Sequence, residues 1–372
     1  MTDRLKELSD IGVSIWLDDL DRGRLTSGGL AEMVRDKHVV GVTTNPAIFS
    51  KAISQGSDDY AAQVASLADG QADADFAVRE MTTQDVRNAC DVLADVAVRT
   101  NGVDGRVSIE VDPRLARDTE KTVEQAKALW AEVDRPNVLI KIPGTIEGLP
   151  AITDVLGAGI SVNVTLIFSV ERYKEVLNAW ASALEARQVA GEPIDSIESV
   201  ASFFVSRVDT AVDAALEKIG TSEAVDLQGK AGIANARLAW HAYLEFVGSE
   251  RWQALAAAGA KPQRPLWAST GVKDPNFPDD MYVVELAGPG CVNTMPEPTL
   301  LAVEDHGNIH GDTLDGTAEE SRRVFDRLRE VGVDLDAIFV QLEKEGVDKF
   351  EEAWEELLAT VSQALAADRA KQ

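Results

Sequence analysis

One lysine lies in the middle of an apolar segment. The segment "NVLIKIPG", residues 137–144, has the composition of a buried strand, and Lys141 interrupts it. Alternation along a strand places Leu139 and Lys141 on one face and the branched residues Val138, Ile140 and Ile142 on the other. The face with the branched residues must pack against helices. Lys141 therefore points into the interior, where the ammonium form is disfavoured and a neutral amine can form a Schiff base with a carbonyl. A buried ion pair with Glu110 or Asp18 is the alternative.

Two carboxylates end or follow other apolar segments. Asp18 comes directly after "GVSIWL", and Glu110 lies near the end of "RVSIEV". A carboxylate in a water-poor pocket can be tuned toward the working pH and act as a general acid or base. For Asp19 and Asp21 in "DDLDRG", a helix-start or turn role is the preferred interpretation.

The elements that would position these side chains alternate between strand and helix. Segments with helical spacing of apolar residues, such as 119–133 and 169–186, separate most of eight segments with strand composition. The eight are 12–17, 38–43, 106–111, 137–142, 159–164, 199–205, 264–269 and 282–287. This pattern predicts the α/β class and a single (β/α)8 TIM barrel. A doubly wound open sheet is the alternative, but no GxGxxG turn follows the first strand.

The last part of the chain has only helical patterns, at 319–332 and 347–367. We therefore expect a barrel catalytic domain over 1–312 and a C-terminal helical extension over 313–372, packed on the barrel. Two segments rich in turn formers are predicted to be irregular, namely 50–59 and 273–280.

In a barrel, the carboxyl ends of the strands and the loops after them carry the residues that reach substrate. The polar residues at these places are Asp18, Asp19, Asp21, Thr43, Thr44, Asn45, Glu110, Lys141, Asn163, Thr165, Ser202, Ser206, Arg207 and Ser269. In "TTNPAIF" (43–49), capping of the next helix is the alternative role for one polar residue. Arg207 could hold a phosphate with Ser202 or Ser206, and a surface salt bridge is the alternative.

Composition argues against several classes of function. The net charge of −27, without a basic cluster, argues against a nucleic-acid partner. No apolar run is long enough for a membrane span and no signal segment is seen, so a cytoplasmic location is expected. Cys90 and Cys291 do not suggest a disulfide framework, and Cys90 is predicted to be a core residue. His306 and His310 are four residues apart, but Gly307 weakens any helix there, and no metal is assigned.

Seven segments together resemble transaldolases. They are "GVTTNPAIF", "SIEVDPRLA", "VLIKIPGT", "VNVTLIFS", "SFFVSRVD", "PLWAST" and "NTMPEPTL", and the similarity covers residues 10 to 300. The resemblance implies a barrel of the class I aldolase kind and a transferase of the pentose phosphate pathway. It implies cofactor-free transfer of a dihydroxyacetone unit from sedoheptulose 7-phosphate or fructose 6-phosphate to glyceraldehyde 3-phosphate or erythrose 4-phosphate. Phosphorylated sugars are thus the expected partners.

The resemblance also implies roles for single residues. Lys141 would form the Schiff base, Asp18 would be the acid/base at the C3–C4 bond, and Glu110 and Thr165 would hold a water. The implied substrate-binding residues are Thr43, Asn45, Asn163, Ser202, Phe204, Arg207 and Ser269, with Arg207 on the phosphate. Shorter members carry a second phosphate-binding arginine after the seventh-strand serine. Here the run is "ASTGVKDPNF", so Lys273 is predicted as the second phosphate ligand.

Two rival functions stay open. One is a Schiff-base aldolase on the same barrel that releases free dihydroxyacetone, and the other is a non-catalytic barrel that binds sugar phosphates. The oligomeric state is not determined by any sequence pattern, and a monomer or homodimer is expected.

Overall fold

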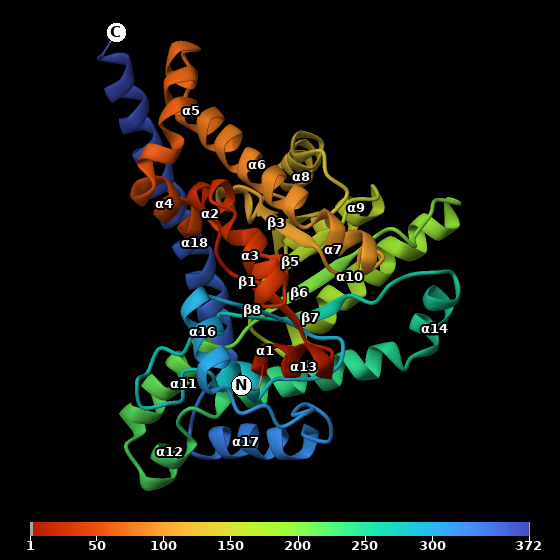
Figure 1. The fold of residues 1–372 in the computed structure, drawn as a ribbon. Coiled ribbons are helices and arrows are strands. Elements are labelled where there is room, and N and C mark those ends of the chain that lie inside the picture. The colour runs from red at the N-terminus through yellow and green to blue at the C-terminus, as the bar shows by residue number, and fades with distance from the viewer. Residues whose placement is uncertain (1–2, 372) are drawn as a thin grey trace.

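Eight parallel strands form a closed barrel in the computed structural model, which describes residues 3–371 (Figure 1). The strands are β1 (Ser14–Leu17), β2 (Val39–Val42), β3 (Arg106–Glu110), β4 (Val138–Pro143), β5 (Val162–Ile167), β6 (Ser199–Phe204), β7 (Arg264–Ala268) and β8 (Val292–Met295). Each strand pairs with the next in sequence order, and β8 closes the barrel on β1. The predicted (β/α)8 barrel is confirmed, and the open sheet is wrong.

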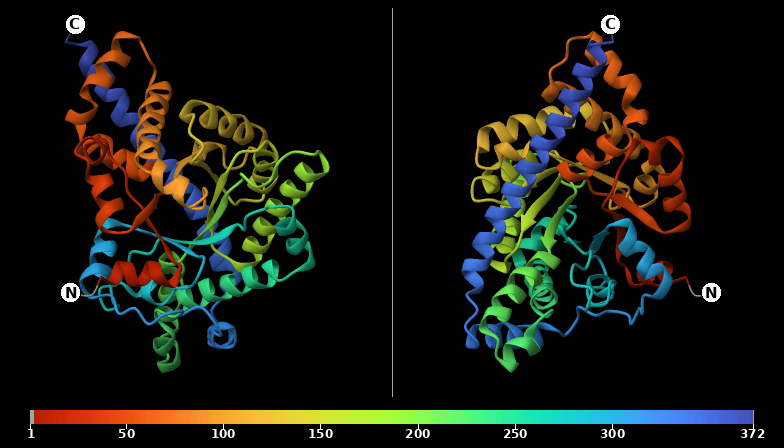
Figure 2. Two further views of the ribbon diagram at one scale, coloured as in Figure 1. Left: turned by 45° about the vertical axis from the view of Figure 1, so that its right-hand side comes forward. Right: turned by 90° about the vertical axis from the view of Figure 1, so that its left-hand side faces the viewer.

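Helices surround the barrel and extend beyond it (Figures 1 and 2). They are α1 (Arg4–Ile11), α2 (Arg22–Thr26), α3 (Gly29–Asp36), α4 (Pro46–Gln55), α5 (Ser57–Asp69), α6 (Ala74–Val92), α7 (Ala94–Arg99), the 3-10 helix η1 (Pro113–Leu115), α8 (Thr119–Val133), α9 (Gly148–Gly157), α10 (Val170–Val189), α11 (Ser206–Ile219), α12 (Ser222–Leu227), α13 (Ala231–Val247), α14 (Glu250–Ala257), α15 (Met281–Val284), α16 (Glu297–His306), α17 (Ala318–Glu330) and α18 (Leu335–Arg369).

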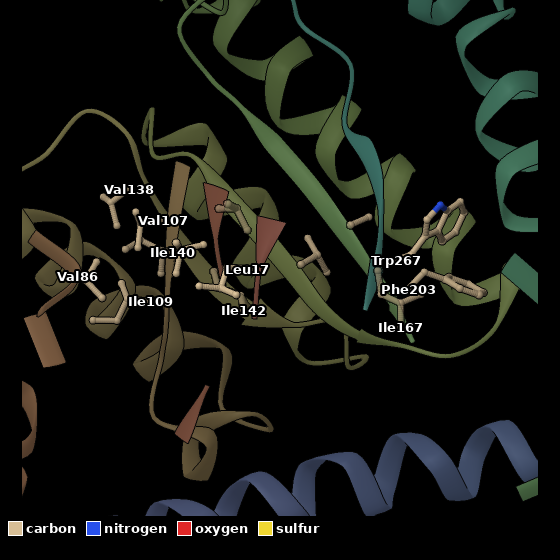
Figure 3. Packing of buried hydrophobic residues seen from close by; sticks show 14 of the residues in the cluster. Leu17, Val86, Val107, Ile109, Val138, Ile140, Ile142, Ile167, Phe203 and Trp267 are labelled. Carbon is tan, nitrogen blue, oxygen red and sulfur yellow. The ribbon is translucent and has the colours of Figure 1, made fainter. Parts of the chain in front are cut away.

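The two faces of β4 separate as the alternation predicts. Val138, Ile140 and Ile142 are fully buried in the apolar layer between the strands and the helices (Figure 3). Leu139 belongs to a different cluster, together with Trp16 and other residues of the barrel interior. Lys141 lies on the same face as Leu139 and so is inside the barrel.

The eighth strand was predicted in the wrong place. Residues 282–287 include the last three residues of the short helix α15, and β8 is "VNTM", about ten residues later. The predicted segment is apolar because it is buried against the barrel, where the Tyr282 hydroxyl donates to Asp209. The real strand carries Asn293 and Thr294, so it lacks the apolar run that indicates a strand, and pairing with β1 selects it.

The segment 50–59, predicted to be irregular, contains parts of the two helices α4 and α5. Its turn formers mark helix ends: Gly56 follows α4, and Asp58 and Asp59 lie in the first turn of α5, where acidic side chains are favourable. The other irregular segment, 273–280, contains no helix or strand, as predicted.

The C-terminal helix α18 is longer than its sequence pattern indicated. It begins at Leu335, where the Asp334 side chain caps it, and it has 35 residues, so it is about 50 Å long. Figure 2 shows it running diagonally along one side of the barrel to the C-terminus, and it packs against α4, α5, α6, α11 and β5. The helix therefore contacts the carboxyl ends of the strands, where the predicted site lies.

Candidate active site

A cavity of about 180 Å³ lies at the carboxyl ends of the strands. Its lining includes nine of the predicted residues, namely Asp18, Thr43, Asn45, Lys141, Ser202, Phe204, Arg207, Ser269 and Lys273. The other three lie beside these: Glu110 next to Lys141, Asn163 bonded to Ser202, and Thr165 opposite Pro143 in the β4–β5 pairing. The barrel thus brings all twelve predicted residues together.

Larger cavities lie elsewhere on residues 3–371, with volumes of about 260, 330, 340 and 520 Å³. The one of about 260 Å³ adjoins the site, because Asn45 and Glu110 line it together with Trp354 of α18, and the one of about 520 Å³ lies at the opposite end of the strands, near Arg106. None of these four is lined by Lys141. Size alone therefore does not identify the site, whereas the convergence of charged groups does.

Lys141 is buried, with 4% of its surface exposed. Its Nζ donates a hydrogen bond of 3.1 Å to the backbone carbonyl of Thr44 and lies 3.6 Å from Oε2 of Glu110. The second distance is too long for a hydrogen bond but brings opposite charges together. The ion pair of the alternative interpretation is therefore present, and it leaves the amine only one direct hydrogen bond to the described residues.

Glu110 is a buried acid beside Lys141. Burial raises the pKa of Glu110 from 4.5 to about 7, although the nearby Lys141 ammonium acts in the opposite direction. Neither carboxylate oxygen has a hydrogen-bond partner within residues 3–371, and the buried hydroxyl of Thr165 has none there either. Near neutral pH this carboxyl can gain or lose a proton, which is the requirement for a general base or acid.

Asp18 is held by a hydrogen-bond chain from two neighbouring strands. The Thr43 hydroxyl donates to Oδ1 of Asp18 at 2.6 Å and, having one proton, accepts from the Thr294 hydroxyl at 2.6 Å. Burial raises the pKa of Asp18, while Lys141 and the Thr43 hydrogen bond act in the opposite direction. The neighbour Asp21 caps α2, as the sequence indicated, and Asp19 pairs with Arg24.

Hydroxyl and amide groups line the strand ends in a fixed orientation. Asn163 donates from Nδ2 to the Ser108 hydroxyl at 3.0 Å, and its Oδ1 accepts a hydrogen bond from the Ser202 hydroxyl at 2.7 Å. These bonds determine which way the buried amide points. Asn45 caps α4 through Oδ1, which accepts from the Ile48 N–H, so the capping role that was the alternative is present for this residue.

Arg207 is the second residue of the helix α11, lies beside the cavity and forms no ion pair with the described residues. Its buried Nη1 has no hydrogen-bond partner there, and burial lowers its pKa while Asp18 and Glu110 act in the opposite direction. The surface salt bridge that was the alternative is therefore wrong.

Lys273 is exposed at the rim of the same cavity as Arg207, and the Ser269 hydroxyl is 2.8 Å from that of Ser206. Two cations and two hydroxyls there suit a phosphate.

Five residues that line the cavity were not predicted, namely Ala268, Gly271, Thr294, Pro296 and Phe350, and two of them carry side chains that bear on the site. Thr294 was missed because β8 was assigned to another segment. Phe350 was missed because it lies on α18, far along the chain from the barrel motifs. The spacing of apolar residues in 347–367 does indicate a buried helix face, but it carries no signal for what that face covers.

Several further features of the described chain bear on ligands. Cys90 and Cys291 are buried free thiols, so the core position predicted for Cys90 is confirmed. Within residues 3–371, no group of three His, Cys, Asp or Glu side chains is arranged to hold a metal ion. His306 pairs instead with Asp279 and Asp305. Within the same range, no helix has both the length and the apolar character needed to cross a membrane.

Comparison with known proteins gives consistent matches over nearly the whole chain. The sequence model of the family "Transaldolase/Fructose-6-phosphate aldolase" matches residues 15–361. The chain is 59% identical over 363 residues to a transaldolase of Thermobifida fusca, with 98% of each chain covered. It is 59% identical over 366 residues to a transaldolase of Mycolicibacterium smegmatis, again covering 98% of each. A transaldolase of Saccharopolyspora erythraea is 58% identical over 367 residues, which cover 99% of this chain and 98% of the relative.

Proposed function

The chain belongs to the transaldolase/fructose-6-phosphate aldolase family, and from this premise we propose that it acts as a transaldolase with Lys141 as its nucleophile. It transfers a dihydroxyacetone unit from sedoheptulose 7-phosphate to glyceraldehyde 3-phosphate, giving erythrose 4-phosphate and fructose 6-phosphate. The observation that carries the residue assignment is the Lys141 amine, buried at the barrel mouth 3.6 Å from a carboxyl whose pKa is about 7.

The first step joins donor and enzyme. Glu110 takes one proton from the Lys141 ammonium, the freed amine attacks the C2 carbonyl of the ketose, and Glu110 returns the proton to the C2 oxygen, which leaves as water, so that a protonated imine remains. Glu110 and Thr165 have unpartnered oxygens beside this position, so they are suited to hold that water and to move its proton. The same groups serve the last step, in which water adds to the imine and frees the amine.

The second step breaks and remakes the C3–C4 bond. Asp18 accepts the proton of the C4 hydroxyl, the bond breaks, and its electron pair moves into the imine, which becomes an enamine. The first aldehyde leaves, and the acceptor aldehyde takes its place. The enamine carbon then attacks the acceptor, and Asp18 returns the proton to the new hydroxyl. Asn45, Asn163, Ser202 and Thr43 orient the three-carbon unit throughout.

Arg207 is proposed to bind the substrate phosphate, with Ser269, Phe204 and Lys273 on the walls of the same subsite. The proposal is supported by the lack of an ion-pair partner for Arg207 in residues 3–371 and by its unpartnered Nη1. The division into a barrel (1–312) and a helical extension (313–372), a cytoplasmic location and a monomeric or homodimeric state are likewise kept as predictions.

A two-substrate assay tests the function. With fructose 6-phosphate and erythrose 4-phosphate, sedoheptulose 7-phosphate and glyceraldehyde 3-phosphate should accumulate in equal amounts. With fructose 6-phosphate alone, little free dihydroxyacetone should appear. Copious release of dihydroxyacetone without an acceptor would indicate the rival aldolase. Lack of turnover in both assays would indicate a non-catalytic protein that binds sugar phosphates.

Replacing Arg207 by glutamine should weaken donor binding. Loss of charge-assisted hydrogen bonds to phosphate should raise KM about 30-fold or more and change kcat less. Steady-state kinetics measure both constants, and the exposed Arg323, replaced in the same way, is the control. An unchanged KM would mean that the phosphate binds elsewhere.

The acidic limb of the pH profile should come from Glu110. Because burial raises its pKa to about 7, the carboxyl is neutral below that pH and cannot accept a proton. The kcat/KM of transfer should therefore fall as the pH drops below about 7. Glu110→Gln should lower the rate and remove this limb, as measured in buffers of constant ionic strength. A limb that persists in the variant would assign it to another group.

A further inference from the structure

Three residues on one face of α18 meet the barrel mouth. Gly346, Phe350 and Trp354 are four residues apart, so they share a helix face. A Cβ on Gly346 would lie 3.0 Å from the Leu166 side chain and 3.3 Å from the Phe168 ring, so glycine lets the helix approach the end of β5 without displacing these side chains. The close contact at Gly346 places the next turn of the helix over the cavity.

Phe350 covers the two cations of the site. Its side chain is buried, its ring centroid is 5.7 Å from the Lys141 Nζ, and it is 5.9 Å from the Arg207 guanidinium carbon. Arg207 also lies 5.1 Å from the Phe204 ring centroid, so its guanidinium contacts two aromatic rings. Both distances to Phe350 are within the range of cation–π attraction. Phe350 is therefore part of the cavity wall and not only of the apolar packing under α18.

We propose that Phe350 is a specificity-determining residue, which keeps water from the three-carbon intermediate and so directs it to transfer rather than release. This inference rests on the proposed function. The ring presents an apolar face toward the amine that carries the intermediate, and it donates no proton. It also restrains Arg207, whose own sequence neighbours provide no ion pair in residues 3–371.

The two outcomes differ in what meets the enamine carbon. In transfer, that carbon forms a bond with the acceptor aldehyde, whose oxygen takes one proton from Asp18. In release, the carbon takes a proton from water, which leaves the protonated imine and hydroxide. The hydroxide adds to the imine carbon, a proton passes from the new hydroxyl to the nitrogen, the C–N bond breaks, and free dihydroxyacetone and the Lys141 amine are formed. Both routes end in hydrolysis of an imine, so a wall that keeps water from the enamine carbon slows only the protonation that commits the intermediate to release.

The test compares two substitutions at Phe350 with one elsewhere on the same helix. Phe350→Ala opens the wall, and Phe350→Leu keeps most of the apolar volume but removes the aromatic face. Phe339→Ala is the matched control, because Phe339 lies on α18 but stacks on Phe325, with ring centroids 6.4 Å apart, and does not line the cavity. Free dihydroxyacetone and transfer product are measured together with both sugar phosphates present, and the donor KM is determined.

The ratio of release to transfer should rise about tenfold in Phe350→Ala and about threefold in Phe350→Leu, and should stay near wild type in Phe339→Ala. The donor KM should rise about fivefold in both Phe350 variants, because Arg207 loses one aromatic contact. Circular dichroism checks the fold. If Phe350→Ala does not fold, the ratio of release to transfer in Phe350→Leu tests the proposal.

An unchanged ratio in a folded Phe350 variant, with normal transfer by the wild type, overturns the role of Phe350 alone. A similar rise in Phe339→Ala also overturns it, because the effect would then come from general loosening of α18. If the wild type itself does not transfer, the proposed function fails instead, so the two failures are distinguishable.

Discussion

Replacing Lys141 by methionine should lower kcat/KM for transfer by about 10⁴-fold or more, because no other group can form the imine. Methionine keeps the length and apolar stem of lysine but has no amine. The loss should appear in kcat and not be recovered at high substrate concentration, since the chemical step itself is removed.

The fold should survive this substitution. The ammonium has two carboxyl neighbours in the site, Glu110 and Asp18, and both already have a raised pKa. Without the cation these pKa values should rise further, so both groups become neutral and avoid an uncompensated buried charge. The thermal transition should therefore stay cooperative.

Borohydride trapping identifies the nucleophile directly. Reduction in the presence of fructose 6-phosphate should add the mass of a reduced three-carbon adduct to the wild type at Lys141 and none to Lys141→Met. The exposed Lys127, replaced by methionine, is the control and should trap like the wild type. An adduct on another lysine, or residual turnover near the wild-type rate, would refute the assignment.

Replacing Asp18 by asparagine should lower kcat for transfer by about 10²- to 10⁴-fold, the usual contribution of one general acid or base. The side chain keeps its shape, and its amide oxygen can still accept the 2.6 Å hydrogen bond from Thr43. What is lost is the ability to take the C4 hydroxyl proton as the C3–C4 bond breaks. Imine formation does not need that proton transfer.

The two substitutions should thus separate two steps. Asp18→Asn should still be trapped by borohydride with fructose 6-phosphate, as an adduct of the whole sugar phosphate rather than of three carbons. Mass spectrometry distinguishes the two adducts. Asp19→Asn is the neighbouring control and should keep most of its activity, because Asp19 pairs with Arg24. A three-carbon adduct in Asp18→Asn would show that another group accepts the proton.

Local sequence patterns predicted most strands of the barrel and most residues of the site. The alternation of β4 placed Lys141 inside, and the polar residues at strand ends converge because the carboxyl ends of parallel strands meet at one mouth. The prediction failed for β8 because "VNTM" is short and half polar, while the apolar residues 282–287 are buried in and after the short helix α15. The turn formers of 50–59 were misread because the same residues also occur at helix ends.

Composition and spacing within a few residues are enough to predict the fold class, the family resemblance and the residues at seven of the eight strand ends. The segment that closes the barrel and the element that covers its mouth follow only from tertiary packing. Pairing with β1 selected β8, and the close approach at Gly346 brought Phe350 over Lys141, across two hundred residues of chain. Such contacts depend on how distant elements pack, and no local pattern records them.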